Sequence, residues 1–290
     1  MKKEKITLIG AGLAGPLMAT HLAKRGYFVD IYERRPDMRK VSQSAGRSIN
    51  LALSIRGIHA LKEVGVYDKI EPITIPMTGR MIHDLNGETH LQPYGQKKDE
   101  MIYSVSRAQL NMDLLTLAEE TGRVKIHFDH KLVSADLDKN ELTFGEKIIQ
   151  FNIVIGCDGS ASPLRKAIIE KSKADYVKKP LGHGYKELVI PPSKSGEFLL
   201  EPNALHIWPR GEFMLIALPN FDRTFTCTLF FPMIGSSSFE TVKNENDIED
   251  LFQNYFPDAY ELMPTLVKDF HKNPIGNLAT VYCDPWHGQD

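Results

Sequence analysis

Three glycines near the start of the chain stand at a spacing that suits phosphate binding. They form the motif Gly10-x-Gly12-x-x-Gly15, between an apolar run and a helical pattern. The first glycine permits a tight turn, the second lets backbone approach a pyrophosphate, and the third lets helix and strand pack closely. The first helical turn adds free N–H groups and the positive end of the helix dipole. The motif therefore predicts a dinucleotide site, without deciding between FAD and NAD.

Charged residues follow the next predicted strand. Glu33 ends that strand, where a carboxylate can hydrogen-bond a ribose hydroxyl. Arg34 and Arg35 come next and could instead pair with the 2′-phosphate of NADP. Glu33 argues against that alternative, because its carboxylate would repel the phosphate.

Two further polar residues each allow a structural and a functional interpretation. Arg107 directly follows Ser106, the predicted cap of a helix. A cation is unfavourable at a helix N-terminus, so Arg107 is either an exposed arginine or the partner of a nearby phosphate. Asp158 lies in the glycine-flanked turn "GCDG", either as a structural Asx-turn or as a cofactor ligand.

Arg80 and Tyr94 lie near the two ends of a predicted hairpin, "GRMIHDLNGETHLQPYG". Its Asn-Gly pair favours a two-residue type I′ turn, which places Tyr94 opposite Gly79 and points Arg80 and Tyr94 to opposite faces. Pro93 cannot donate to a ladder, so we expect a bulge or break there that turns both side chains toward one site. They would then suit a carboxylate; the alternative is a surface arginine and a half-buried tyrosine.

Two later strands alternate in polarity. Met214, Ile216 and Leu218 share one face of "GEFMLIALPN", and Thr228 and Phe230 share one face of "FTCTLFFP". Such faces either pack on a core or wall an apolar pocket. Periodicity by itself favours the core.

The elements that must position these residues fall into two groups. Residues 5–33 are typical of a strand-helix-strand unit with parallel strands, and helices are predicted over 48–65 and after the capping box Ser106–Gln109. "NIVIG" suits a buried strand. From about residue 180, short strands between Pro, Gly and Asn indicate an antiparallel sheet, followed by a helix capped by Asn244 or Asn246. The fold class is α/β, with a nucleotide-binding part interrupted and followed by a second sheet.

Composition excludes several classes of protein. The chain has 290 residues, 42% of them hydrophobic, and a net charge of −2, which indicates neither a nucleic-acid nor a membrane-surface partner. Its three cysteines form no CxxC pair, so we expect no zinc site and a reducing cytoplasm. The basic start mimics a signal peptide, but the fixed glycines favour the dinucleotide site. We expect no membrane segment, metal or hydrolase triad.

Longer stretches make the chain resemble the aromatic-ring flavoprotein hydroxylases, and among them the branch that acts on L-kynurenine. The resemblance covers essentially all 290 residues, through "GAGLAG", "GRSINLALS", "RMIHDLNG", "QPYG", "YSVSR", "IGCDG", "HGYKEL", "EPNALHIWPR", "IALPN" and "FTCTLFFP". The run from "EPNALHIWPR" to "FTCTLFFP" is the most restrictive. The resemblance implies one FAD, NADPH as a transient co-substrate, and hydroxylation to 3-hydroxy-L-kynurenine through a C4a-hydroperoxyflavin. The flavin carries the chemistry, so no protein residue is expected to be catalytic.

The resemblance also implies site residues and domains. FAD contacts are expected at Gly10, Gly12, Ala14, Gly15, Tyr32, Glu33, Arg34, Arg35, Ala52, Arg107, Leu132 and Asp158, with Asp158 serving flavin and NADPH together. Substrate contacts are expected at the carboxylate ligands Arg80 and Tyr94 and along an apolar wall of Leu205, Met214, Ile216, Leu218, Thr228 and Phe230. A Rossmann-like FAD-binding domain would span 1–75 and 100–178, an interleaved antiparallel substrate domain 76–99 and 179–275, and residues 276–290 would return toward the FAD domain.

One departure from the family bears on activity. The family continues past "CDPWHGQD" into a Gly-Asp motif that binds flavin, so we expect the 290 residues to hold FAD poorly and to turn over little. The alternatives are another flavin-dependent aromatic hydroxylase, a halogenase or reductase of the same fold, an NAD(P) dehydrogenase without flavin, and an inactive fragment.

Overall fold

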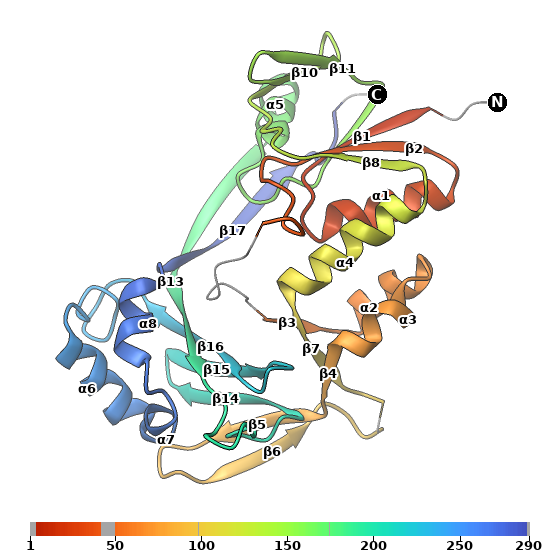
Figure 1. Cartoon of the computed structure of the whole chain (residues 1–290). Coiled ribbons are helices and arrows are strands. Elements are labelled where there is room, and N and C mark those ends of the chain that lie inside the picture. The colour runs from red at the N-terminus through yellow and green to blue at the C-terminus, as the bar shows by residue number, and fades with distance from the viewer. Residues whose placement is uncertain (1–3, 42–49, 98, 174, 289–290) are drawn as a thin grey trace.

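The glycine motif lies at the carboxyl ends of the strands of a parallel sheet. The structure, a computed structural model, describes residues 4–41, 50–97, 99–173 and 175–288. The sheet has the order β12-β1-β2-β8, and all its pairs are parallel. Figure 1 shows β1, β2 and β8 of this sheet. Its strands are β1 (Lys5–Ile9), β2 (Phe28–Tyr32), β8 (Val124–His127) and β12 (Ile153–Gly156). Helix α1 (Ala14–Lys24) joins β1 to β2, which confirms the predicted strand-helix-strand unit.

Each face of this sheet has its own cover. Helices α1 and α4 (Arg107–Glu120) pack on one face, where the small side chains of Ala19, Ala23 and Ala118 allow close approach. The other face carries a small sheet and a helix, with Leu142, Phe144 and Leu164 packed against Ile9 and Tyr32. These elements are β9 (Ser134–Asp136), β10 (Glu141–Phe144), β11 (Lys147–Gln150) and α5 (Pro163–Ser172). The result is a three-layer Rossmann-like domain.

A second small sheet, β3-β7-β4, corrects the helix predicted over 48–65. Residues 48–49 lie outside the described residues, Asn50–Leu53 form strand β3, and the helix begins only at Ile55. The apolar spacing of Leu51 and Leu53 also suits a strand, and pairing with β7 decides between the two. The region contains α2 (Ile55–Glu63), α3 (Tyr67–Ile70), η1 (Glu71–Ile73), β4 (Thr74–Met77) and β7 (Ile102–Ser106).

The second large sheet has seven strands in the order β17-β13-β16-β15-β14-β5-β6. They are β17 (Gly276–Asp284), β13 (Asp175–Ile190), β16 (Phe225–Pro232), β15 (Phe213–Pro219), β14 (Ala204–Arg210), β5 (Gly79–His83) and β6 (Thr89–Pro93). The hairpin β5–β6 thus joins strands that are more than 100 residues away in the sequence. Its attachment to β14 is parallel, whereas the other pairs are antiparallel.

Helices α6 (Glu245–Tyr255), α7 (Pro257–Glu261) and α8 (Leu266–Lys272) lie together on one side of this sheet (Figure 1). They bury the largest hydrophobic cluster, which includes Trp208, Phe225, Phe231, Phe252 and Phe256. Of the two caps predicted for α6, Asn244 is the one used, in a reciprocal capping box.

The fold class is the one predicted: a Rossmann-like α/β domain with an interleaved antiparallel sheet. Long strands β13 and β17 run side by side from one part to the other, with Asp175 opposite Asp284 (Figure 1). The exact domain boundaries stay a prediction. Among the described helices, none combines the length and the apolar character that crossing a membrane needs.

Candidate functional site

The three glycines of the motif do three different things. Gly10 has a φ of 100°, and a Cβ there would lie 2.4 Å from the Cys157 carbonyl oxygen. A Cβ on Gly15 would lie 2.0 Å from the Gly10 carbonyl oxygen, so this glycine lets α1 approach the turn. A Cβ on Gly12 would meet no described atom within 4 Å, because Gly12 faces a cavity. Two glycines therefore serve packing, and the middle one leaves room for a ligand.

Glu33 holds the glycine turn in place. Its Oε2 accepts a hydrogen bond from the Ala11 N–H at 2.7 Å, and its Oε1 accepts from the Arg35 N–H and Nε at 3.0 and 2.8 Å. Burial acts to raise the pKa of Glu33, but these hydrogen bonds and the Arg35 charge hold it below its ordinary value. The side chain is therefore a carboxylate whose Oε2 can accept one more hydrogen bond, as from a ribose hydroxyl.

Asn111 is a site residue that the sequence analysis missed. It lies on the buried side of α4, and its Nδ2 donates to the Ala11 carbonyl at 3.0 Å. Glu33 and Asn111 thus hydrogen-bond the two backbone groups of Ala11, its N–H and its carbonyl. The available signal was an amide side chain between the apolar positions Leu110 and Leu114 of a helix, where a buried polar group needs a partner.

A cavity of about 710 Å³ lies over the glycine turn. Ten of the twelve residues predicted to contact the cofactor line it: Gly10, Gly12, Ala14, Tyr32, Glu33, Arg34, Arg35, Arg107, Leu132 and Asp158. A second cavity of about 440 Å³ shares Glu33, Arg35 and Arg107 with it. Gly15 is buried under the turn, and Ala52 is exposed on β3 and lines neither cavity. The structure therefore brings together most of the predicted cofactor residues, but not Ala52.

The two polar residues with open interpretations both line this cavity. Arg107 starts α4 after Ser106, whose hydroxyl accepts from the Gln109 N–H at 3.3 Å. The Gln109 side chain donates to Asp113 instead of returning to the cap, so only half of the predicted capping box forms. Asp158 accepts a long hydrogen bond of 3.4 Å from the Leu164 N–H, which supports the structural interpretation, and it also lines the cavity.

The donors of the cavity fit a dinucleotide cofactor such as FAD. Helix α1 begins without a side-chain cap, so its first N–H groups remain for a pyrophosphate beside Gly12. Arg34, Arg35 and Arg107 supply positive charge, and Glu33 supplies the ribose acceptor.

We expect Glu33→Ala to weaken FAD binding by tenfold or more and to lower the free energy of unfolding by about 1–3 kcal/mol. The variant loses the ribose acceptor and leaves the buried Ala11 N–H without its partner. Equilibrium dialysis with FAD and urea unfolding without FAD measure the two effects. Glu146→Ala, at an exposed turn, is the control. Wild-type FAD affinity in Glu33→Ala would contradict the assignment.

The predicted register of the β5–β6 hairpin is wrong by one residue. Gly79 pairs with Pro93 and Arg80 with Gln92. The loop has three residues: Asp84 and Glu88 face each other across it, the Gly87 N–H bonds to the Asp84 carbonyl, and Gly87 has a φ of 86°. This is a type I turn with a G1 bulge rather than a type I′ turn.

The corrected register removes the need for a distortion at Pro93. Tyr94 lies two residues beyond Gln92, the partner of Arg80, so both side chains share a face. The Tyr94 N–H bonds to the Thr78 carbonyl, so the ladder continues past Pro93 without a bulge. Pro93 is tolerated because β6 is an edge strand and the proline falls at a position without a ladder hydrogen bond.

Arg80 and Tyr94 are in contact. The Arg80 guanidinium lies over the Tyr94 ring, with its Cζ 4.6 Å from the ring centroid. The Tyr94 Oη is buried and has no hydrogen-bond partner among the described residues. Burial raises the pKa of Tyr94 above its ordinary value, against the opposing charge of Arg80, so the hydroxyl keeps its proton. A buried donor without a partner, beside an arginine, is suited to an anionic ligand such as a carboxylate.

The predicted apolar wall lies on the same face as Arg80. Leu205 pairs with Arg80 across β14 and β5, and Ile207, two residues further on, pairs with Ile216. Cross-strand pairing places the remaining wall residues on this face as well: Ile216 pairs with Thr228, Met214 with Phe230, and Leu218 with Thr226. Helices α6–α8 pack on the opposite face, so the wall is not the domain core. Periodicity favours the core, but this face lies outside the hydrophobic cluster that these helices cover, although Leu218 and Thr228 are buried. That the face walls a substrate pocket stays a prediction.

The opposite face of the hairpin carries a buried polar chain. His83 Nδ1 lies 2.9 Å from Asp258 Oδ2, and His83 Nε2 lies 2.8 Å from His206 Nδ1. The last hydrogen bond of this series runs from His206 Nε2 to the Glu201 carbonyl, at 2.8 Å. Trp208 stacks on His83 and donates its Nε1–H to the same Asp258 oxygen. We call these four side chains the His83 relay.

His206 predicts an acid-sensitive fold. Burial, with the His83 charge adding to it, lowers the pKa of His206 from 6.5 to about 4. The unfolded chain therefore binds a proton between pH 6.5 and 4 that the folded chain does not, and we expect about 3 kcal/mol of stability to be lost over that interval. His206→Gln keeps a donor for Glu201 but cannot titrate, so urea unfolding should show a correspondingly shallower loss. His59→Gln, at an exposed position, should follow the wild type; equal acid slopes for all three proteins would refute the assignment.

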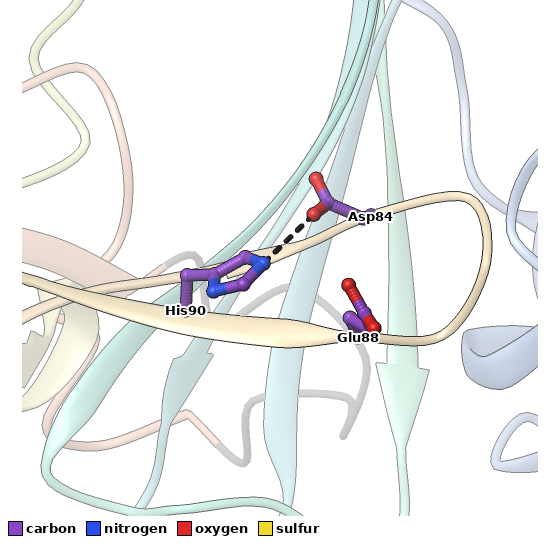
Figure 2. Close-up of side chains that lie close together, drawn as sticks. All are labelled: Asp84, Glu88 and His90. Atoms are coloured by element: carbon purple, nitrogen blue, oxygen red, sulfur yellow. Dashed lines mark ion pairs between the residues drawn. The ribbon is translucent and has the colours of Figure 1, made fainter.

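Three potential metal ligands meet at the hairpin tip. Asp84, Glu88 and His90 bring their ligand atoms within 4.8 Å of one another, and Figure 2 shows His90 turned toward Asp84. These two already form an ion pair at 3.0 Å, and Glu88 and His90 are exposed. Exposed groups of this kind are common without a metal, and we assign none here.

Comparison with known proteins agrees with this geometry. A family model described as "FAD binding domain" matches residues 3–180. The chain is 45% identical to the kynurenine 3-monooxygenase of Myxococcus xanthus over 99% of its own length and 63% of the relative. It is 44% identical to the enzyme of the same name from Sus scrofa, over 99% of this chain and 61% of the relative. The chain thus spans under two thirds of these relatives.

Solved structures share the fold. A tetrameric 2-methyl-3-hydroxypyridine-5-carboxylic acid oxygenase superposes with a TM-score of 0.77 at 18% identity, over 99% of this chain and 73% of that one. The tetracycline destructase Tet(51) superposes with a TM-score of 0.64 at 20% identity, over 98% of this chain and 72% of that one. At these identities the likeness establishes the fold alone.

Proposed function

Because this chain belongs to the FAD-binding domain family, we propose that it is an FAD-dependent, NADPH-using monooxygenase that converts L-kynurenine to 3-hydroxy-L-kynurenine. The supporting observation is the buried Tyr94 hydroxyl, which has no hydrogen-bond partner among the residues that the structure describes and lies beside Arg80 at the edge of an apolar wall. Kynurenine has a carboxylate for the first feature and an aromatic ring for the second. Two relatives named kynurenine 3-monooxygenase are similar to the chain over nearly its whole length.

The cofactor end of the proposed site binds and orients. Gly12 and the N-terminus of α1 would hold the pyrophosphate, Glu33 a ribose hydroxyl, and Arg107 a phosphate. When bound, FAD supplies the redox chemistry that inserts one oxygen atom of O₂ into the ring. We propose that Asp158, just beyond the C-terminal end of β12, serves both flavin and NADPH.

The substrate end fixes the ring and excludes water. Arg80 offers two parallel N–H groups to the carboxylate, and Tyr94 adds an O–H donor from the same face. Leu205, Ile216 and Leu218 would lie against the ring and keep water from the reacting carbon. No group on the protein has to act as a nucleophile. The cytoplasmic location suggested by the cysteines stays a prediction.

Kynurenine-dependent NADPH oxidation tests the proposal. Purified protein supplied with excess FAD should consume NADPH and O₂ in equal amounts with the 3-hydroxy product formed, at a low rate. Other aromatic acids with an amino group ortho to a carbonyl form the comparison panel. Faster product formation from another member of the panel would overturn the substrate assignment, and protein that binds no FAD would overturn the proposal as a whole.

A further inference from the structure

The His83 relay attaches the hairpin that carries Arg80 to the rest of the sheet. His83 is three residues from Arg80 in β5 and points to the opposite face, where it contacts β14 through His206 and α7 through Asp258. The backbone pairing of β5 with β14 ends at Ile82 and Ile207. Beyond that point, the described attachments of this end of β5 to β14 and α7 are those of His83: its ring, and its carbonyl, which accepts from Arg210 Nη1 at 2.9 Å.

The hydrogen bonds determine where the protons are. The Glu201 carbonyl can only accept, so His206 Nε2 carries a proton. Because burial lowers the pKa of His206 to about 4, its ring is neutral and its Nδ1 is an acceptor. His83 Nε2 must therefore be the donor in the contact between the two rings.

The other nitrogen of His83 faces a carboxylate. Burial acts to raise the pKa of Asp258, but the hydrogen bonds from His83 and Trp208 hold it below its ordinary value. Asp258 is therefore ionised, and His83 Nδ1, 2.9 Å from its Oδ2, must donate as well. A ring that donates from both nitrogens is an imidazolium, so His83 carries a positive charge inside the domain.

We propose that protonated His83 is a positioning residue for the carboxylate-binding pair, holding β5 against β14 and α7 so that Arg80 and Tyr94 keep their place beside the apolar wall. This inference rests on the proposed function for its consequence, but not for the protonation of His83. If His83 loses its proton, two lone pairs face each other at the Asp258 contact, and the hairpin loses that attachment.

The charged neighbours of His83 come from three elements. Asp258 belongs to α7, His206 and Arg210 to β14, and Asp84 follows His83 in the chain. Asp84 is paired with His90 at the exposed hairpin tip (Figure 2). Asp258 Oδ1 and Arg210 Nη2 are buried without a hydrogen-bond partner among the described residues.

NMR of the His83 ring nitrogens tests the protonation directly. At neutral pH, both nitrogens of His83 should carry a proton in the wild type, and Asp258→Asn should leave the ring neutral because it removes the anion. A neutral His83 in the wild type at that pH overturns the proposal. This measurement needs neither substrate nor flavin, so it stands even if the proposed function fails.

Kinetics of His83→Gln test the positioning role. One amide nitrogen cannot donate to both Asp258 and His206, so the KM for L-kynurenine should rise about tenfold while kcat and FAD content stay within about twofold of the wild type. The selective rise in KM is the sign of a positioning role. A purely structural role would lower stability and FAD content without raising KM selectively.

Arg80→Ala distinguishes a failure of the proposed carboxylate-binding pair from a failure of the positioning role of His83. If it leaves the KM for L-kynurenine unchanged, the carboxylate-binding pair of the proposed function is wrong. If Arg80→Ala raises KM but His83→Gln leaves KM as in the wild type, only the positioning role is wrong. Should His83→Gln fail to fold, Asp258→Asn provides the same test, because it removes the carboxylate that faces His83 Nδ1.

Discussion

Replacing Arg80 with alanine is expected to raise the KM for L-kynurenine by about 100-fold, because removing one partner of a hydrogen-bonded charge pair typically costs 2–5 kcal/mol. The guanidinium is the proposed carboxylate ligand, and it lines neither of the two cavities beside the glycine turn. FAD content should therefore not change. Steady-state kinetics with flavin absorbance on the same samples measure both quantities.

Arg56→Ala is the matched control, since this arginine is exposed on α2. It should leave KM unchanged. A parallel loss of flavin and kynurenine binding in Arg80→Ala would mean that the residue maintains the fold instead of contacting the substrate.

Tyr94→Phe sharpens this test. The Tyr94 hydroxyl has no hydrogen-bond partner among the described residues, so removing it should not lower the free energy of unfolding. The substrate carboxylate loses a donor, and KM should rise about tenfold. A variant with wild-type KM would indicate that the buried hydroxyl does not contact the substrate.

The second large effect is expected at the glycine motif. Gly15→Ala should lower the free energy of unfolding by about 3 kcal/mol, because its Cβ would lie 2.0 Å from a backbone oxygen that cannot move without shifting the turn. Gly12→Ala should leave stability within about 1 kcal/mol of the wild type, since its Cβ meets no described atom. Both variants should lose FAD.

Gly12→Ala is the informative variant of the two. It should fold normally and still bind FAD at least tenfold more weakly, because the added methyl group occupies the space through which a pyrophosphate approaches the backbone. Urea unfolding without FAD, combined with equilibrium dialysis, separates the two effects. Wild-type FAD affinity in Gly12→Ala would place the pyrophosphate elsewhere.

Local signals in the sequence were read correctly where the chain itself decides the structure. The apolar run, the glycine spacing and the helical pattern that predict the strand-turn-helix lie close together in the sequence, although the close contact that requires Gly10 is with Cys157. Helix ends show the same effect, because Gly26, Gly65 and Gly122 all adopt positive φ just after a helix. Backbone conformation at such positions is restricted by sterics, which a sequence expresses directly.

Two predictions were wrong where the local sequence fits two structures equally well. Residues 50–53 satisfy both helical and strand spacing, and pairing with β7 decides for the strand. The Asn-Gly pair in the hairpin allows a two-residue or a three-residue loop, which differ by one residue in register. That one-residue difference reverses which face a side chain occupies, and it brought Arg80 and Tyr94 together without the bulge expected at Pro93.

The sequence by itself determined the glycine turn, the strand that ends just before Glu33, and the alternation that sets Met214, Ile216 and Leu218 on one face of a strand and Thr228 and Phe230 on one face of the next. Only the tertiary structure decided which face of that sheet is covered by α6–α8, that Asn111 reaches the Ala11 carbonyl, and that His83 meets Asp258 from 175 residues away. The physical reason is the range of the forces involved. Steric limits and periodicity act between near neighbours, whereas burial and hydrogen-bond partners depend on which distant segments pack together.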